Sequence, residues 1–220
     1  MDSELYIEGY DLIRSDRNRH DGGVVCYIKK DSHYNVRKNC PTDFENIFLD
    51  HLLPNSKPIL IGILYRPPDQ SGFLDMVLSA TADMEDFDNQ EAYILADLNF
   101  NLVDKSKYIL DTKYSKVMVP LAKKYSQFCC MHNLKQLIMS PTRVSKATST
   151  LLDHFMTNSN ELVSHSGVLD IGLSDHQLVF CTRKIQKTKY FKHKTIKTRS
   201  LKNIPQNISV TNSNMLTLPM

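Results

Sequence analysis

The chain has 220 residues, of which 41% are hydrophobic and 23% are charged, with a formal net charge of +3. This length and composition allow one buried core, which excludes a chain that is disordered throughout and predicts a single domain with a tail. No apolar run approaches the length needed to cross a bilayer, which excludes a helical membrane protein.

The first half of the chain predicts four strands and a helix. Residues 6–16 predict a strand and a turn, and Gly22-Gly23 allow a sharp turn into a strand over Val24–Ile28. Further strands are expected over residues 46–53 and 59–65, with the turn Pro54–Pro58 between them. Residues 73–87 have apolar positions near helical spacing, and Ser71 is the expected amino cap.

The second half predicts another helix and several strands. A helix is expected over residues 114–133, with one apolar side formed by Val117, Leu121, Tyr125, Phe128 and Met131. Strands are expected over residues 134–138, 150–156, 161–170 and 177–185. Because strands and helices do not alternate regularly, we expect mixed sheets that pack face to face with helices outside.

The chain ends in a basic segment. From Cys181 onward there are nine Lys or Arg residues and no acid, so 18 basic and 24 acidic residues precede it. A basic tail on an acidic body favours contact with polyanions, and a solvated linker to a following domain is equally compatible with the composition. We expect a domain over residues 5–183 and a disordered tail over residues 184–220.

The cysteines and the amino terminus indicate the compartment. The five cysteines are an odd number with no CxxC spacing, which predicts neither a zinc site nor a disulfide framework and favours a reducing environment. The amino terminus lacks the basic-then-apolar pattern of a signal peptide. We expect an intracellular protein with no membrane contact and no stable protein partner.

Residues 93–102 are the most informative stretch for function. An apolar run, Tyr93–Ala96, predicts a buried strand, and polar residues follow it at the carboxyl end. Side chains alternate along a strand, so Asp97 and Asn99 are expected on one face and Leu98 on the other. A carboxylate and a carboxamide would then face the same cleft.

Two later stretches place further polar groups at the ends of strands. Asp153 lies in an apolar segment, where an unpaired acid is expensive to bury, and its neighbour His154 is expected to be structural on the opposite face. Asp175 and His176 stand directly before another apolar run. Each group alone is more often a cap, a turn residue or a surface side chain, so the prediction depends on their convergence.

Five motifs together resemble the endonuclease/exonuclease/phosphatase superfamily, and within it the endonuclease module of non-LTR retrotransposons. The resemblance covers roughly residues 5–183. The motifs are Gly62-Ile63-Leu64-Tyr65-Arg66-Pro67-Pro68, Leu95-Ala96-Asp97-Leu98-Asn99, Ser140-Pro141-Thr142-Arg143, Leu152-Asp153-His154 and Leu173-Ser174-Asp175-His176. It implies an α/β (α+β) fold, a four-layer sandwich of two mixed β-sheets flanked by helices.

The resemblance also implies a metal-dependent phosphodiester hydrolase that nicks DNA. His176 would pair with Asp153, which fixes its tautomer, and Asp97 would orient or deprotonate the attacking water. The implied cofactor is Mg²⁺, with Mn²⁺ as an alternative, and the implied partner is the DNA phosphate backbone in the nucleus.

The remaining roles are implied for residues that surround this pair. Asn99 would donate to a phosphate oxygen, Tyr65 would steady the phosphate, and Asp175 would be a metal ligand. Thr142 and Ser174 would add hydroxyl contacts to the substrate.

The sequence departs from the family pattern in its first strands. In the family these strands supply an Asn and a Glu that binds Mg²⁺, and neither Glu4 nor Glu8 lies in a matching context. Ala96 stands where the family has Gly, and Leu98 where it has Phe. We expect an exposed sheet edge and impaired activity. The alternatives are a catalytically inactive retroelement remnant, a polyanion-binding module, and another phosphatase or exonuclease of the superfamily.

Overall fold

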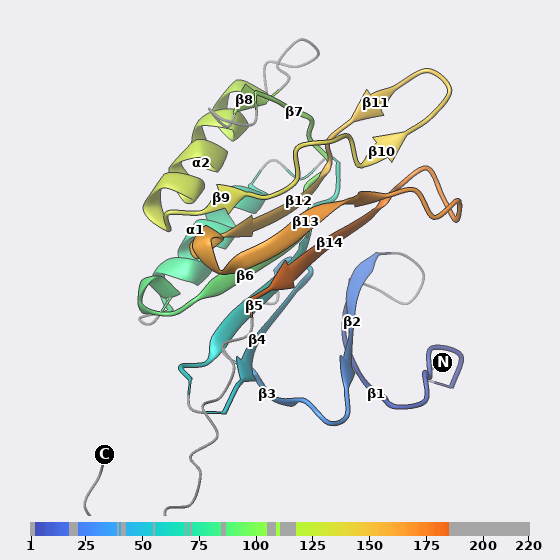
Figure 1. Cartoon of the computed structure of the whole chain (residues 1–220). Helices are drawn as coiled ribbons and strands as arrows, with labels where there is room; N and C mark the ends of the chain where they lie inside the picture. The colour runs from blue at the N-terminus through green and yellow to red at the C-terminus, as the bar shows by residue number, and fades with distance from the viewer. Residues whose placement is uncertain are drawn as a thin grey trace, which may run out of the picture. The chain divides into compact units, whose positions relative to one another are not determined.

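A computed structural model of the chain is shown in Figure 1. It describes residues 3–17, 22–38, 40, 43–54, 56–68, 70, 72–84, 87–104, 109–110 and 118–184. The expected amino cap Ser71, and the expected tail beyond Lys184, lie outside these residues.

A six-stranded mixed sheet forms the centre of the domain. Its strand order is β3-β4-β5-β6-β12-β9, in which β5 and β6 are parallel and the other neighbours are antiparallel. The strands are β3 (His33–Val36), β4 (Asn46–Leu52), β5 (Ile59–Tyr65), β6 (Ala92–Asp97), β12 (Asp153–Thr157) and β9 (Lys135–Gln136).

One face of this sheet is covered by helices α1 (Phe73–Ala82) and α2 (Met118–Met131) (Figure 1). Leu60, Leu64 and Ile94 point to this face and are fully or almost fully buried in the same cluster as residues of both helices. The helices are joined by the His132 ring, which bonds Thr81 through Nε2 at 2.9 Å. This side holds most of the hydrophobic core.

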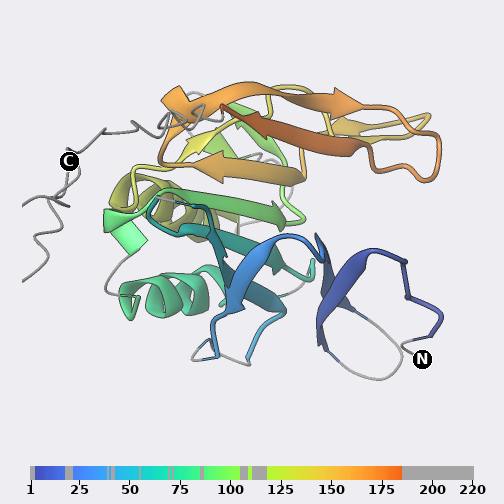
Figure 2. The ribbon, with the colours of Figure 1, turned by 60° about the horizontal axis from the view of Figure 1, so that its bottom comes forward.

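Two antiparallel ribbons lie over the other face of the sheet (Figure 2). The first pairs β1 (Tyr10–Asp16) with β2 (Gly23–Lys29), and the second pairs β13 (Val163–Leu169) with β14 (Leu178–Arg183). They are separate two-stranded units in the described part of the chain. The second layer is therefore divided rather than one continuous sheet.

Short elements complete the described chain. They are the strands β7 (Leu102–Asp104), β8 (Ile109–Leu110), β10 (Arg143–Val144) and β11 (Ser149–Thr150), and the 3-10 helices Phe87–Asn89 and Asn160–Leu162. None of these short elements was expected from periodicity, which needs longer runs than they offer. No helix in the described residues has both the length and the apolar composition that crossing a bilayer requires.

The α/β class and the mixed sheet are confirmed, with differences at the ends of elements. The strand expected over residues 134–138 is reduced to Lys135–Gln136, and α1 ends at Ala82 rather than near residue 87. On α2, Leu121, Tyr125 and Phe128 are buried as expected, but Met131, the last residue of the helix, is 52% exposed. Met131 lies on the expected apolar side by its spacing but is not buried with the other residues of that side.

Candidate active site at the ends of the central strands

The pairing of three strands brings polar residues into one row. Tyr65 on β5 is in register with Asp97 on β6, and Asp97 is in register with Asp153 on β12. Their chain neighbours Leu64, Ala96 and His154 are buried on the helix side. Because side chains alternate along a strand, the three polar side chains project from the opposite face, toward the ribbons.

Asp153 is bonded to a histidine from a distant part of the chain. The Nδ1 atom of His176 lies 3.0 Å from Asp153 Oδ2. His176 lies in the loop before β14, which begins at Leu178. The Ser174 hydroxyl fixes this loop by accepting from the His176 N–H and donating to the His176 carbonyl. The expected pairing of His176 with Asp153 is therefore present in the structure.

Thr142 holds the start of β12. Its hydroxyl oxygen accepts from the backbone N–H groups of Leu152 at 3.0 Å and Asp153 at 2.9 Å, and the residue is 0% exposed. A side chain with no exposed surface has no access to a substrate. The structure thus corrects the expected substrate contact of Thr142, which instead positions Asp153.

Asp97, Asp153 and His176 form a set of donors suited to a cation. One potential ligand atom from each residue lies within 4.8 Å of the others. Burial raises the pKa of Asp97 above its ordinary value, and the charge of Asp153 raises it further, while the Asn99 N–H and His176 act in the opposite direction. Two close carboxylates with one imidazole fit a divalent cation, because its charge would relieve this repulsion.

Asn99 does not continue the strand. β6 ends at Asp97, and Asn99 has a φ of +50°, a conformation that Asn adopts more readily than most residues. Its Nδ2 donates to the Arg66 carbonyl at 2.9 Å, and its N–H donates to Asp97 Oδ1 at 3.1 Å. The expected strand alternation is wrong at this residue, and Asn99 supports the loop and the Asp97 carboxylate.

Asp175 lies outside the donor set. Its Oδ2 accepts from Arg143 Nε at 2.7 Å, and this bond lowers the pKa of the Asp175 carboxyl. The two side chains are 46% and 44% exposed. The contact gives Asp175 a partner other than a metal, and its expected role as a metal ligand receives no support from its position.

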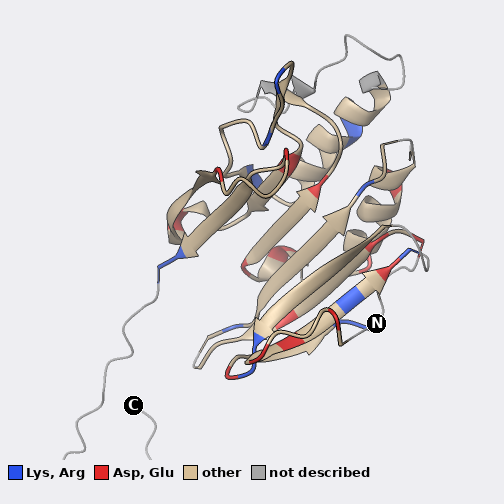
Figure 3. Ribbon diagram, turned by 90° about the vertical axis from the view of Figure 1, so that its right-hand side faces the viewer, with Lys and Arg blue, Asp and Glu red and all other residues tan. Residues whose placement is uncertain are grey.

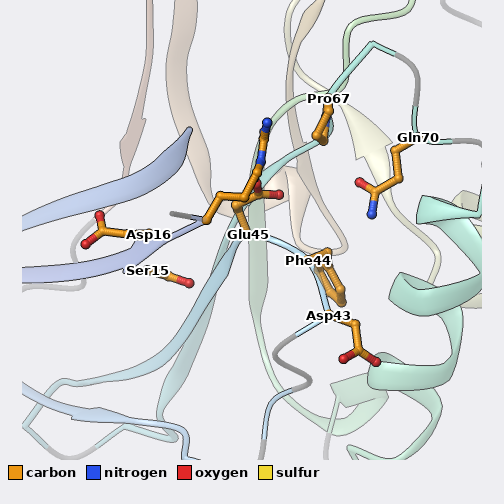
Figure 4. Close-up of a pocket in the computed structure, with 8 residues that line it drawn as sticks. Ser15, Asp16, Asp43, Phe44, Glu45, Pro67 and Gln70 are labelled. Carbon is orange, nitrogen blue, oxygen red and sulfur yellow. The ribbon is translucent and has the colours of Figure 1, made fainter. Parts of the chain in front are cut away.

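Arg17 and Glu45, which belong to none of the five motifs, extend the row. Glu45 precedes β4 and accepts the Tyr65 N–H at 3.1 Å through its carbonyl. Its buried carboxylate pairs with Arg17, whose guanidinium lies 5.5 Å from the centre of the Tyr65 ring. Arg17 and Glu45 line a cavity of about 280 Å³ between the end of β1, the start of β4 and the loop after β5 (Figure 4).

A signal for Glu45 was present in the sequence, but there was none for Arg17. Glu45 stands directly before the expected strand Asn46–Leu53, so antiparallel pairing with the next strand would bring it opposite Tyr65. The Arg17 contact joins a loop to a residue 28 positions later, and no local pattern encodes such a contact.

His154 is structural, as expected. It is buried on the helix side, where its Nδ1 lies 2.7 Å from the Tyr125 hydroxyl. Burial lowers the pKa of His154 to about 3, which keeps the ring neutral. Its neighbour Asp153 points to the other face, so adjacent residues serve the core and the candidate site.

No protein-family model matches the sequence, and no curated protein matches it. Among solved structures, the chain is similar to the endonuclease domain of TRAS1, a telomere-specific non-LTR retrotransposon, with a TM-score of 0.62 and 14% identity over 82% of this chain and 83% of that one. It is also similar to a mannosyl-6-phosphatase from Bacteroides thetaiotaomicron, with a TM-score of 0.55 and 14% identity over 84% and 80%.

A third similar structure is an endonuclease/exonuclease/phosphatase family protein from Leptotrichia buccalis, with a TM-score of 0.53 and 13% identity over 83% of this chain and 74% of that one. The chain has the endonuclease/exonuclease/phosphatase fold. The cluster of Asp97, Asp153 and His176 lies at one end of the central sheet of this fold.

Two substitutions of Thr142 test whether its hydroxyl, rather than the volume of its side chain, stabilises the start of β12. In Thr142→Val the N–H groups of Leu152 and Asp153 lose their acceptor. We therefore expect the free energy of unfolding, measured by urea denaturation, to fall by about 1–3 kcal/mol. Thr142→Ser retains the hydroxyl and is the matched control, with a smaller loss than Val. Equal stability of the Val variant and the unsubstituted chain would contradict the positioning role.

Proposed function

We propose that the chain is a metal-dependent phosphodiester hydrolase of retroelement origin that nicks DNA. The observation that carries the proposal is the 3.0 Å contact of His176 with Asp153 beside Asp97, at the end of the central sheet. Hydrolysis of a phosphodiester needs a water nucleophile, stabilisation of charge on the phosphoryl group and a proton for the departing oxygen. The cluster contains a group for each need.

Asp97 and Asp153 would hold the cation, with Mg²⁺ as the first expectation because both residues offer carboxylate oxygens, and Mn²⁺ as the alternative. A bound divalent cation would supply positive charge for the phosphoryl oxygens. The remaining steps belong to the side chains of the chain itself.

His176 would move the proton. Its Nδ1 faces Asp153, so Nε2 is the nitrogen available to the substrate or to water. The Asp153 carboxylate fixes the imidazole tautomer and stabilises the ring when it is protonated. Asp97, in register with Asp153, would orient the attacking water from the neighbouring strand.

Other residues would position the phosphate. Tyr65 stands beside Asp97 and carries a hydroxyl that would donate to a phosphate oxygen. One N–H of the Asn99 amide is used on Arg66, and the second would serve the phosphate. Ser174 would act by fixing the His176 loop, and Asp175 by holding Arg143.

DNA is the proposed substrate for two reasons. The five sequence motifs resemble those of retroelement endonucleases, and the endonuclease domain of the TRAS1 retrotransposon has a similar fold. Acidic and basic residues are interspersed over the described strands and loops (Figure 3). A nuclear location would follow from an activity on chromosomal DNA.

A phosphatase is the second candidate, because the chain is also similar in fold to a mannosyl-6-phosphatase. Hydrolysis of a phosphomonoester and of a phosphodiester both require a water nucleophile and stabilisation of charge on the phosphoryl group. Release of inorganic phosphate from a sugar phosphate without nicking of a plasmid would favour this candidate.

The central prediction concerns supercoiled plasmid DNA. The purified chain with Mg²⁺ should convert supercoiled plasmid to the open circle, and EDTA should stop the conversion. Asp97→Ala and His176→Ala should each lower the rate at least about a hundredfold, because each removes a group that acts on the reacting atoms. The rate is measured from band intensities on agarose gels.

The matched control is His165→Ala, which removes a largely exposed histidine on β13. We expect this variant to nick at the unsubstituted rate. Absence of nicking by the unsubstituted chain with either Mg²⁺ or Mn²⁺ would contradict the proposal and favour a catalytically inactive remnant. Nicking that survives both active-site substitutions would point to a contaminating nuclease.

A second prediction concerns the binding of metal at different pH values. Mn²⁺ should raise the melting temperature at about pH 7, and the increase should be smaller at about pH 5, because protons compete with the cation for carboxylates. The raised pKa of Asp97 makes this competition begin at a higher pH than for an ordinary Asp. Differential scanning fluorimetry measures both shifts.

The matched variants for this measurement are Asp97→Asn and Asp170→Asn. Asp97→Asn should abolish the Mn²⁺ shift, and Asp170→Asn, at an exposed position after β13, should retain it. An Mn²⁺ shift of the same size in Asp97→Asn would show that the cation binds elsewhere.

A further inference from the structure

The two faces of the central sheet are covered to different extents. On the helix face, Leu60, Leu64 and Ile94 are at most 3% exposed. On the opposite face, Ile61, Ile63 and Leu95 remain partly exposed, although they lie in the middle of the same strands. Apolar side chains at the centre of a six-stranded sheet are normally buried on both sides when layers pack on both faces.

The incomplete cover has a definite place between the two ribbons. The β1–β2 ribbon packs over a small cluster formed by Val24, Ile47 and Leu49, and β13–β14 packs on the main core through residues such as Val168 and Val179. A groove of about 290 Å³ is lined by residues of β2 and β14. Its lining includes Val25, Ile63, Leu95 and Val179, with Asp97 and Asp153 also in it.

Each wall of this groove is a strand with one partner. In the described part of the chain β2 pairs with β1 alone, and β14 pairs with β13 alone. Directly after β2, the Lys30 N–H donates to the Gly9 carbonyl at 3.0 Å, which sets the alternation of bonded pairs along the ribbon. By this alternation the peptide groups of Val25 and Tyr27 point away from β1.

The strand edge, the apolar floor and the two carboxylates of the groove indicate the kind of ligand that fits it. Backbone donors and acceptors on a strand edge are satisfied by another extended chain, whereas a helix has already used its own peptide groups. The apolar floor requires apolar side chains at alternate positions of that chain. The carboxylates of Asp97 and Asp153 favour a basic side chain near them when no cation is bound.

We propose that this groove binds an extended segment of a partner polypeptide by strand addition to β2. The segment carries apolar residues at alternate positions and an Arg or Lys close to the Asp97 and Asp153 carboxylates. Binding buries Ile63, Leu95 and Val25 and supplies hydrogen-bond partners to the open edge of β2. The open edge of β2 lies outside the Asp97, Asp153 and His176 cluster, but the basic residue of the segment would share the two carboxylates with the cation of the proposed function.

The test uses a fluorescein-labelled, end-blocked peptide in which Val and Thr alternate and Arg stands at one end. Fluorescence anisotropy should show saturable binding to the full chain. Two control peptides have the same sequence and carry N-methyl groups on alternate residues, one on the odd-numbered and the other on the even-numbered residues. At least one of them should bind about tenfold more weakly or worse, because strand addition needs the peptide N–H groups. Equal affinity of all three peptides would overturn the proposal.

The matched variants are Val25→Pro and Val36→Pro. Both valines are 40% exposed, and the bond from Arg37 N–H to the Phe48 carbonyl places the Val36 peptide group away from β4, as Val25 is placed away from β1. Val25→Pro should weaken peptide binding about tenfold, and Val36→Pro on β3 should leave it unchanged. Circular dichroism confirms that each variant is folded.

Hydrogen exchange of the unsubstituted chain keeps the proposal testable if Val25→Pro does not fold. The peptide should slow exchange in residues 23–27 of β2. Protection confined to other strands, or absence of peptide binding, would overturn the proposal. Self-association of the chain that protects β2 without peptide would also overturn it, because a second copy would then be the occupant.

Discussion

The register between β6 and β12 is the constraint on which the candidate site depends. It sets Asp97 opposite Asp153, and the parallel pairing of β5 with β6 adds Tyr65 to the same row. Side chains alternate with a period of two, so a slip of one residue would turn Asp153 into the core and bring His154 to the site. The register is held by burial of His154 against Tyr125 and by the Thr142 hydroxyl, which binds the start of β12. Packing on one face of the sheet thereby fixes the chemistry on the other.

This arrangement places mutually repelling groups where they can act on a ligand. Asp97 and Asp153 are close enough that the charge of Asp153 raises the pKa of Asp97, and His176 offsets part of this effect. Such a cluster weakens the protein on its own and gains stability when a cation binds. The ribbon face is also the face that is incompletely covered, so the site lies beside an open groove rather than within a closed core.

The sequence predicted the long elements and the acids, and it was less informative about turns and long-range contacts. Strands over residues 46–53 and 59–65 follow from continuous apolar runs, whereas β10 and β11 are two residues each and have no period to detect. Asn99 was expected to share the face of Asp97, but the chain leaves the strand through a left-handed turn. Thr142 was expected at the substrate, and its burial became evident only once β12 was placed beside it.

Crystals soaked in Mn²⁺ and measured at a wavelength with strong manganese anomalous scattering test the central claim most directly. The account predicts one anomalous peak bound by the Asp97 and Asp153 carboxylates, with His176 still hydrogen-bonded to Asp153. A peak at Asp175, or none near Asp97 in crystals whose other Mn²⁺ sites are occupied, would contradict it.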